Sequence, residues 1–357
     1  MGSIKSVITA TGSYLPEQIV ANEDFLQHLF LQKDGLAVPG TTQRNIEKFQ
    51  QITGIRQRRY ANTEQNASDL AFLAAKDLLD SGDIDPESLD YIILAHNFGD
   101  VCFGSNRIDI LPSLASRVKC QLEINNPNCI AYDLVFGCPG WLQGLIQADY
   151  YIRSGDARRC LIIGTETLSR VTDKHDRDSM IYADGAGAVL VEAVANSQRG
   201  IISHQAQTHA GAYTMLLSMN KSYNTADTNK DAFIKMNGRA LYEFAISNVP
   251  QLVRQMLDKA GVHITEIKKV LIHQANEKMD QVIMERLFKL YGIGSFPADI
   301  MPMIIQSLGN SSVATIPTLL DQIYKNKLAH HSFQAGDKIV FTSVGAGMNI
   351  NALLYQF

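Results

Sequence analysis

Short apolar runs alternate with amphipathic stretches along most of the chain. The runs have the length of buried strands, and the stretches repeat apolar residues at helical spacing. Glycine, proline and asparagine separate them, as turns and helix caps require. The predicted strands are 5–10, 89–96, 129–136, 160–165, 186–192, 269–273, 338–344 and 350–357. The predicted helices are 22–31, 46–53, 67–81, 139 to near 155, 237–260, 274–290 and 314–324, with a short helix ending near 118.

This alternation predicts an α/β fold in which helices cover the sheets. The pattern also runs twice, because a helix and a short strand precede a chemically reactive residue in 67–96 and again in 237–273. We therefore expect two pseudo-duplicated halves, residues 1–195 and 196–357. The polar segments 32–45, 97–112 and 197–237 are expected to be loops and irregular structure. Residues 1–6 loosely match an acylation pattern, but we interpret them as the lead-in to the first strand.

Residues 131–144 place a cysteine where a predicted strand turns into a predicted helix. Gly137 permits a sharp turn, Cys138 occupies the expected helix N-cap, and Pro139 suits the first helical position. The positive end of the helix favours a thiolate, so we expect the pKa of Cys138 to fall. A thiolate there would be a nucleophile. A buried, inert cysteine explains this stretch equally well.

Two further polar residues occupy comparable positions in the second half of the chain. His273 ends a predicted strand before a helix, and Asn310 follows a glycine before another helix. Both positions allow a side chain to reach a cleft. A lone histidine is more often structural, and an asparagine before a helix is most often a simple cap.

Composition narrows the class of protein. Hydrophobic residues make up 46% of the 357 residues and charged residues 19%, which is typical of a globular protein. The formal net charge of −4 argues against nucleic-acid binding. The five cysteines are odd in number and show no metal-knuckle spacing, which favours a reducing, cytoplasmic location and no metal site. No apolar run is long enough to predict a membrane span.

Two glycine clusters superficially suggest a nucleotide-binding loop. Such a loop must follow a strand and open a helix. Residues 184–188 instead lead into a predicted strand, and too few residues follow 345–347 for the required helix and acidic partner. We therefore expect no dinucleotide cofactor.

Taken together, these segments resemble the thiolase-fold condensing enzymes, specifically the ketoacyl-acyl carrier protein synthase III type. The resemblance covers nearly the whole chain. It is carried by Thr-Gly-Ile-Arg at 53–56, Gly-Cys-Pro-Gly at 137–140, Arg-Val-Thr-Asp at 170–173, Asp-Gly-Ala-Gly-Ala at 184–188, His-Gln-Ala-Asn at 273–276, Gly-Asn-Ser-Ser at 309–312 and Gly-Ala-Gly at 345–347.

The resemblance implies a thiolase-like fold of two βαβαβ halves in a five-layered αβαβα arrangement. Cys138 would accept an acyl group from a thioester, and the backbone N–H groups of Cys138 and Gly347 would form the oxyanion hole. His273 and Asn310 would hold the carbonyl of the second thioester while its α-carbon attacks the acyl-cysteine, and Asn276 would support them. Neutral hydrogen-bond donors suit a developing enolate, so no cofactor or metal is expected.

The resemblance also implies partners. The acyl and acceptor groups would arrive on acyl carrier protein or coenzyme A, and the chain would form a homodimer in which Leu111 and Pro112 line the partner's substrate tunnel. The family usually has an arginine, which contacts coenzyme A, where this chain has Ile52. This departure favours a carrier protein as donor, with four arginines as candidate docking charges: Arg56, Arg58, Arg59 and Arg254.

Other departures favour a specialised lipid or polyketide pathway. The family usually has alanine where this chain has Gly137 and Pro139, and the segments 26–45 and 99–109 look longer than in the housekeeping enzymes. One branch that fits is the ketosynthase of dialkylresorcinol synthesis, in which the second substrate is a β-ketoacyl thioester. A base would then be needed, and Glu64 is a candidate, although an exposed surface carboxylate is its commoner role.

Two other functions remain open from the sequence. An acyltransferase of the same fold would pass the acyl group to a hydroxyl or amine. A non-catalytic subunit would only bind acyl chains or a partner ketosynthase. The presence of Cys138, His273 and Asn310 argues against the second alternative.

Overall fold

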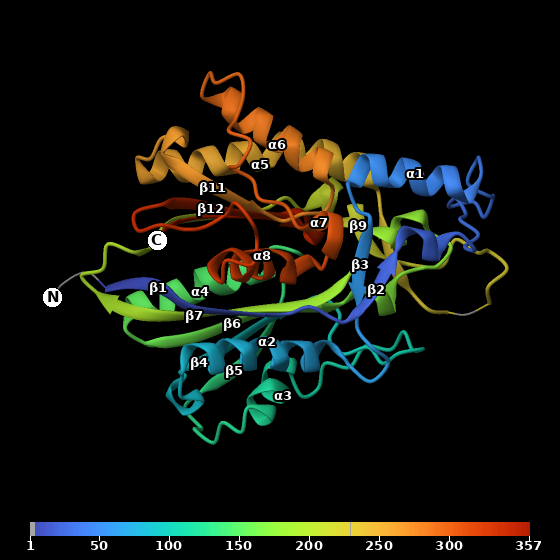
Figure 1. Ribbon diagram of the computed structural model, residues 1–357. Helices are drawn as coiled ribbons and strands as arrows, with labels where there is room; N and C mark the ends of the chain where they lie inside the picture. The colour runs from blue at the N-terminus through green and yellow to red at the C-terminus, as the bar shows by residue number, and fades with distance from the viewer. Residues whose placement is uncertain (1–3, 229) are drawn as a thin grey trace.

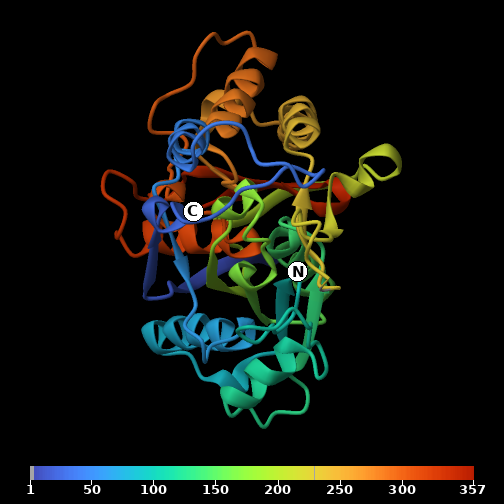
Figure 2. The same cartoon turned by 90° about the vertical axis from the view of Figure 1, so that its right-hand side faces the viewer.

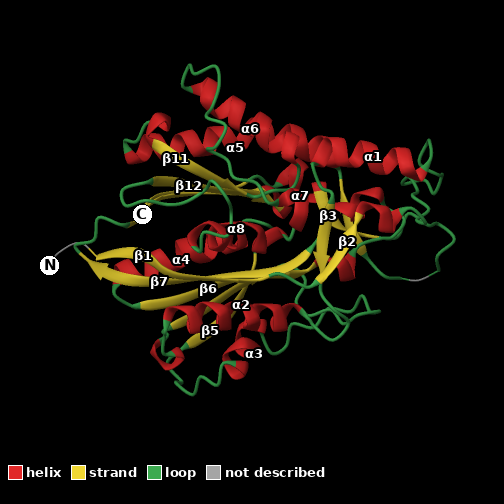
Figure 3. Ribbon diagram, viewed as in Figure 1, coloured by secondary structure: helices red, strands yellow, loops and turns green. Residues whose placement is uncertain are grey.

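The computed structural model describes residues 4–228 and 230–357, and it stacks two β-sheets between helical layers. Residues 1–3 of the loose acylation pattern lie outside the described part. Figure 1 shows α5 and α6 above the upper sheet, α4 and α8 between the sheets, and α2 and α3 below the lower sheet. The expected five-layered αβαβα arrangement is confirmed, and Figure 3 shows the helical and strand layers in contrasting colours.

The lower sheet draws its strands from the first 195 residues. Its order is β1-β7-β6-β4-β5, antiparallel across β1/β7 and β7/β6 and parallel across β6/β4 and β4/β5. The strands are β1 (Ile4–Tyr14), β4 (Tyr91–His96), β5 (Ile130–Val135), β6 (Arg159–Thr167) and β7 (Asp184–Ala195).

The upper sheet draws its strands from residues 200–356 and repeats the same directions. Its order is β8-β13-β12-β11, antiparallel, antiparallel and then parallel. The strands are β8 (Gly200–Thr208), β11 (Ile267–Ile272), β12 (Lys338–Gly345) and β13 (Asn349–Gln356). This shared order is what a duplicated unit predicts, with β11 the counterpart of β4.

Helices cover both faces of each sheet because the central strands carry apolar side chains on both faces. The lower layer contains α2 (Ala67–Gly82) and α3 (Leu114–Gln121), and the upper layer contains α5 (Gly238–Ala260) and α6 (Glu277–Leu290). The shared middle layer contains α4 (Gly140–Ser154) and α8 (Thr315–Tyr324). Trp141 of α4 and Phe341 of β12 pack in this middle core, so neither half closes its core alone.

A group of smaller elements closes one end of the stack. It consists of α1 (Thr42–Thr53), α7 (Ile305–Leu308), the paired strands β2 (Gln18–Ala21) and β3 (Gln57–Tyr60), and the paired strands β9 (Leu217–Asn220) and β10 (Phe233–Met236). Figure 2 looks onto this end of the molecule. Its hydrophobic core contains Phe25, Phe49 and Ile181.

Three local predictions were wrong. The segment 22–31 forms only the 3₁₀ turn Asn22–Phe25, because the Asn22 side chain donates to the Ile55 carbonyl and is committed to a tertiary contact. The segment 197–237 contains β8, β9 and β10 despite its polarity. The strand predicted at 129–136 is not buried: β5 is an edge strand, and Val135 is 66% exposed. No helix in the described part of the chain is long and apolar enough to span a membrane.

Candidate active site

A cavity of about 750 Å³ lies at the end of the stack that the smaller elements close. Cys138, His273 and Asn310 all line it, although they come from separate parts of the chain. Apolar side chains form much of the rest of the wall, among them Phe49, Leu168, Ile181, Leu217, Ile234, Met236 and Leu241. The cavity therefore offers a few polar groups at one end of an apolar space, which is the usual form of a small-molecule site.

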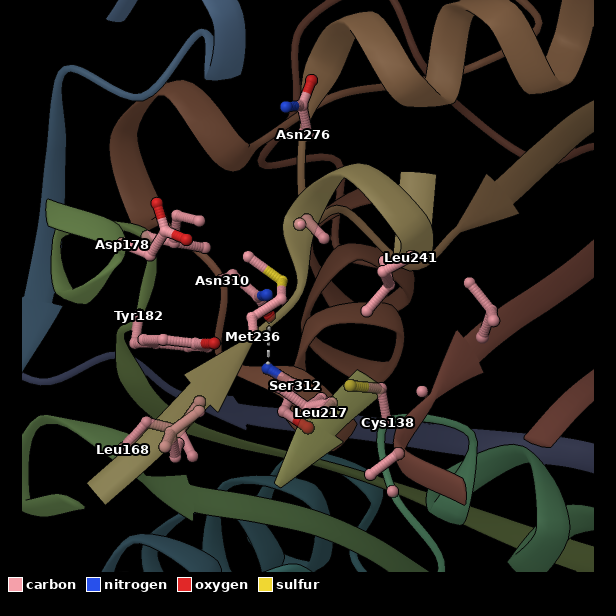
Figure 4. A pocket seen from close by; sticks show the side chains of 18 of the residues that line it. Cys138, Leu168, Asp178, Tyr182, Leu217, Met236, Leu241, Asn276, Asn310 and Ser312 are labelled. Carbon is pink, nitrogen blue, oxygen red and sulfur yellow. Dashed lines mark hydrogen bonds between the residues drawn. The ribbon is translucent and has the colours of Figure 1, made fainter. Parts of the chain in front are cut away.

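Cys138 lies in the turn between β5 and α4, where the sequence predicted it. Gly137 adopts φ of +72°, and a Cβ there would lie 2.8 Å from the backbone nitrogen of Ala346. The helix N-cap is Pro139, so the expectation that Cys138 itself caps α4 was wrong by one residue. Figure 4 shows the sulfur of Cys138 facing the cavity, below Asn310.

The expected fall in the pKa of Cys138 is contradicted. The pKa of the thiol is raised to about 11, chiefly by burial and to a smaller extent by the charge of Glu166, against the lowering effect of the Ser312 side chain. Removing the thiolate from water raises the pKa by more than the adjacent helix end lowers it, because burial is the largest contribution to the shift. The resting group is therefore a thiol that needs a proton acceptor.

His273 follows β11, and its backbone N–H donates to the Thr342 carbonyl at 2.9 Å. The ring is buried, and burial lowers the pKa of His273 to about 4. The imidazole is therefore neutral at physiological pH and presents one N–H donor. Its Nδ1 has no hydrogen-bond partner among the described residues.

Backbone and side-chain hydrogen bonds fix the orientation of Asn310. Its backbone N–H donates to the Ile181 carbonyl at 3.0 Å, and its own carbonyl accepts from Ala183 at 2.8 Å. The side-chain Oδ1 accepts the backbone N–H of Ser312 at 2.8 Å, which Figure 4 shows as a dashed line. Since Oδ1 is occupied in this way, the amide NH₂ is the group left to meet a ligand.

The glycine turn at 345–347 brings the other half of the chain to the cysteine. Gly347, with φ of +75°, lines the same cavity as Cys138. Gly345 packs directly on the backbone of Cys138. Asn276, the expected supporting residue, also lines the cavity, and its side chain caps α6 by accepting from Met279 N at 3.1 Å.

The candidate docking arginines do not form one surface. Arg58 is fully buried and donates to the Val20 and Met180 carbonyls and to Asn22 Oδ1, so its assignment as a docking charge was wrong. Burial lowers the pKa of its guanidinium to about 10. Arg59 bonds the Pro16 carbonyl, and Arg254 bonds the Leu290 carbonyl. Arg56 is exposed and does not line the cavity.

The remaining predicted residues lie on the surface. Glu64 is exposed, lies outside the cavity and accepts a hydrogen bond from Thr63. It is therefore a surface carboxylate and is not placed to act as a base in the cavity. Leu111 is 86% exposed on the loop before α3, followed by Pro112. Neither of these two residues lines the cavity of its own chain.

The structure adds polar residues that sequence reasoning did not assign to the site. Ser312 and Tyr182 line the cavity, as does Asp178, the one carboxylate among its described lining residues. Glu166 lies buried at the end of β6, next to Asn97. Ser312 was within reach of a sequence argument, because it follows Asn310 by two residues. Glu166 lies near the end of an apolar strand, and the sequence pattern of that strand does not indicate which residues from other segments lie beside it.

The described residues contain no group of three histidine, cysteine, aspartate or glutamate side chains arranged to hold a metal ion. The neutral donors of His273 and Asn310 instead converge on the cavity that Cys138 lines. Such a set suits a carbonyl oxygen that gains negative charge.

Comparisons with known proteins agree with this geometry. Residues 132–210 match the 3-oxoacyl-[acyl-carrier-protein] synthase III family, and residues 257–357 match its C-terminal region. The chain is 33% identical over 345 residues to the beta-ketoacyl-[acyl-carrier-protein] synthase III of Lactococcus lactis subsp. lactis, covering 96% of both chains.

Solved structures show the same likeness. The 3-oxoacyl-[acyl-carrier-protein] synthase III of Aquifex aeolicus superposes with a TM-score of 0.78 at 30% identity, covering 99% of this chain and 100% of the other. The priming β-ketosynthase of the R1128 polyketide pathway shares the fold, with a TM-score of 0.79 at 22% identity and coverage of 99% and 96%. The chain therefore belongs to the 3-oxoacyl-[acyl-carrier-protein] synthase III family of condensing enzymes.

Proposed function

We propose that this protein is a ketosynthase that forms a carbon–carbon bond between two acyl thioesters. The observation that carries the proposal is the meeting of Cys138, His273 and Asn310 on the wall of one largely apolar cavity. Each has a distinct role in the proposed reaction: Cys138 holds the acyl group, and the other two hold the acceptor carbonyl.

In the first step the sulfur of Cys138 attacks the thioester carbonyl, and the carrier leaves as a thiol. The backbone N–H groups of Cys138 and Gly347 are proposed to stabilise the oxyanion, because both residues lie at the cavity wall and the two turns pack together. In the second step the His273 N–H and the Asn310 amide donate to the acceptor carbonyl while the acceptor loses carbon dioxide, if it is a malonyl thioester, or an α-proton, if it is a β-ketoacyl thioester, and an enolate forms. Its carbon attacks the acyl group, and Cys138 leaves as the thiolate and regains a proton.

A carrier protein is proposed as the acyl donor, since the family's relatives are named for acyl carrier protein. Among the described residues, the cationic side chains that line the cavity are Lys48, Arg177 and Arg239. Arg239 is 90% exposed and Lys48 is also exposed, so both are accessible to an acidic partner. We propose these residues as docking charges in place of Arg58, whose guanidinium is buried and hydrogen-bonded within the fold.

A specialised pathway, such as dialkylresorcinol synthesis, is proposed from the size and lining of the cavity. A volume of about 750 Å³ with apolar walls suits an acyl chain longer than acetyl. An acceptor that loses a proton rather than carbon dioxide needs a base. Asp178, whose side chain points into the cavity in Figure 4, is a better candidate than Glu64 for that role.

A homodimer is proposed because the lower sheet ends at an open edge. Within the described residues β5 pairs only with β4, and apolar side chains surround this edge. Val135 is 66% and Leu111 is 86% exposed. An edge strand flanked by exposed apolar residues invites pairing with a second copy. A cytoplasmic location remains our proposal from the five unpaired cysteines.

Intact-mass measurement tests the central proposal. The purified protein is exposed to octanoyl-pantetheine, and a single octanoyl adduct that maps to Cys138 is expected, with none on Cys138→Ala. Addition of malonyl-pantetheine should then release a β-ketoacyl product. An ester or amide product would instead identify an acyltransferase, and the absence of any adduct would support a non-catalytic acyl-binding subunit.

A further inference from the structure

A buried carboxyl group lies close to the nucleophile and has no role in the steps above. Glu166 is the penultimate residue of β6 and is 1% exposed. It adjoins the carboxyl ends of the parallel strands β4 and β5, which are followed by Asn97 and Cys138. Polar side chains at this edge of a parallel sheet are generally placed for binding or chemistry. Burying a carboxyl group costs free energy unless it is hydrogen-bonded, so its hydrogen-bond partners indicate its role.

Asn97 holds Glu166 and Ser312 together. Its side-chain nitrogen donates to Glu166 Oε1 at 2.5 Å and to Ser312 Oγ at 3.0 Å. An amide NH₂ has two protons, so each acceptor receives one. The Ser312 oxygen therefore accepts from Asn97, and its own proton is free to be donated elsewhere.

The Ser312 hydroxyl is adjacent to both the thiol and the carboxyl group. Asn97 bridges it to Glu166, it lines the cavity with Cys138, and its side chain lowers the pKa of both Cys138 and Glu166. Its backbone is fixed as well, because Ser312 N donates to Asn310 Oδ1 at 2.8 Å. Ser312 adopts a φ of +52°, a conformation that costs free energy for a residue with a side chain. This unfavourable conformation occurs at a residue that neighbours Cys138, Glu166 and Asn310.

We propose that Glu166 is a positioning residue that accepts, through the Ser312 hydroxyl, the proton that Cys138 loses when it attacks the thioester. The Cys138 proton passes to the Ser312 oxygen while the Ser312 proton passes to Glu166. The sulfur bonds to the acyl carbon, and the carrier sulfur leaves. Glu166 then returns the proton by the same path to the departing carrier thiolate, so that no proton is gained or lost overall. This inference rests on the proposed role of Cys138 as nucleophile.

The relative acidities of the neighbouring groups agree with this assignment. His273, with a pKa lowered to about 4 by burial, is a poor acceptor for a thiol proton. Burial raises the pKa of Glu166 to about 8, so its carboxylate is a much stronger base than an ordinary glutamate. The other charged or titratable groups that bear on this pair are Asp184 of β7 and Tyr182.

A static role and a relay role predict opposite effects of the same substitution. The charge of Glu166 raises the pKa of the Cys138 thiol. If Glu166 acted only through that charge, Glu166→Gln would lower the thiol pKa and make Cys138 more reactive. If Glu166 accepts the proton, the same variant loses the acceptor while keeping the size and the hydrogen bond to Asn97, and Cys138 becomes less reactive.

The experiment measures the rate of octanoyl transfer from octanoyl-pantetheine to Cys138 between pH 6 and 10, by intact mass and peptide mapping. The wild-type rate is expected to rise through an inflection near pH 8, which matches the Glu166 pKa. Glu166→Gln should lose the inflection and load at least about tenfold more slowly at pH 8, the lower range for proton-transfer catalysis. Ser312→Ala should behave alike, and the double variant should be no slower than either single variant.

Asp280→Asn is the matched control, because Asp280 is also a fully buried carboxyl group but lies in α6 and does not line the cavity. It should load at the wild-type rate with the same pH profile. Iodoacetamide alkylation of Cys138 in each variant reports thiol reactivity independently of acyl binding, and thermal unfolding reports folding.

The outcomes separate this proposal from the one on which it rests. No adduct on the wild-type protein would overturn the role of Cys138. A wild-type protein that loads, together with a folded Glu166→Gln that loads equally fast or faster or keeps the inflection near pH 8, would overturn the relay alone.

Discussion

The backbone of Gly345 lies against the backbone nitrogen of Cys138, so closely that a Cβ on Gly345 would overlap it. The contact joins the end of β12 to the turn after β5, and thus one half of the chain to the other. Because the turn that holds Cys138 packs directly against the glycine turn at 345–347, the position of Cys138 depends on both halves of the chain.

Substitution of Gly345 tests that contact. Gly345→Ala must displace the Cys138 turn by several tenths of an ångström, so acyl loading of Cys138 is expected to fall at least about tenfold, since small misplacements at a reaction centre cost large factors in rate. Gly294→Ala is the control, because a Cβ there meets nothing within 4 Å. Loading rates are compared by intact mass. An unchanged loading rate in a folded Gly345→Ala would show that the turn tolerates the shift.

Loss of the His273 ring should separate the two steps of the reaction. Since a neutral, buried His273 is proposed to hold the acceptor carbonyl, His273→Ala should still acquire the octanoyl adduct on Cys138. Its condensation rate should fall by roughly two to three orders of magnitude, the usual effect of removing one donor to a developing oxyanion. Single-turnover assays measure the two steps separately. Failure of His273→Ala to load at all would assign the ring to the first step instead.

Arg58 should contribute to stability, whereas Lys48 should contribute to binding of an acyl carrier protein. Arg58→Met leaves the Val20 and Met180 carbonyls and Asn22 Oδ1 without their buried donor, which should cost roughly 2–4 kcal/mol of unfolding free energy. Lys48→Glu, at the exposed cavity wall, should leave stability unchanged and raise KM for an acyl carrier protein donor but not for a pantetheine donor. Urea unfolding and steady-state kinetics measure the two effects. An unchanged stability for Arg58→Met would contradict the assignment of Arg58 as a structural residue.

Asp178 should make stability depend on pH. Burial, with the nearby Asp176 charge, raises the pKa of Asp178 from 3.8 to about 6. The folded state therefore binds more protons than the unfolded state between these values, and stability falls as the pH rises through pH 4–6. Asp178→Asn removes this penalty, so it should stabilise the protein by at most about 3 kcal/mol at pH 8 and by little near pH 4. Denaturation midpoints at several pH values give the difference, and a gain that does not vary with pH would exclude this cause.

The open edge of the lower sheet should govern assembly. Leu111→Asp places a charge on the most exposed of the apolar residues near this edge and should shift the protein from dimer to monomer in sedimentation velocity. Leu36→Asp is the control, because Leu36 is an exposed leucine in the separate segment 26–45. A wild-type protein that sediments as a monomer would refute the proposed dimer.

The alternating pattern of the chain was sufficient for the class of fold. The apolar strands and the caps of the long helices depend on residues close in sequence, such as Asn237 and Gly261 at the ends of α5. The repetition of helices and strands in two halves was predicted for the same reason, but the order of the strands in each sheet was not. The structure of segment 22–31 could not be predicted in this way, because the Asn22 side chain donates to the distant Ile55 carbonyl. The edge position of β5 could not be predicted either, because it depends on which strands lie beside it.

The sequence by itself identified the candidate residues for the chemistry: Cys138, His273 and Asn310 stand in recognisable motifs, and the structure places all three on the wall of one cavity. Only the tertiary structure determined the protonation states of these residues and the side chains that surround them. Burial depends on residues far away in the chain. It keeps Cys138 a thiol rather than a thiolate and removes Arg58 from the surface, and the same packing places Glu166 and Ser312 near Cys138. Solvation and side-chain contacts arise only when distant segments pack together, and a local pattern of residues cannot contain them.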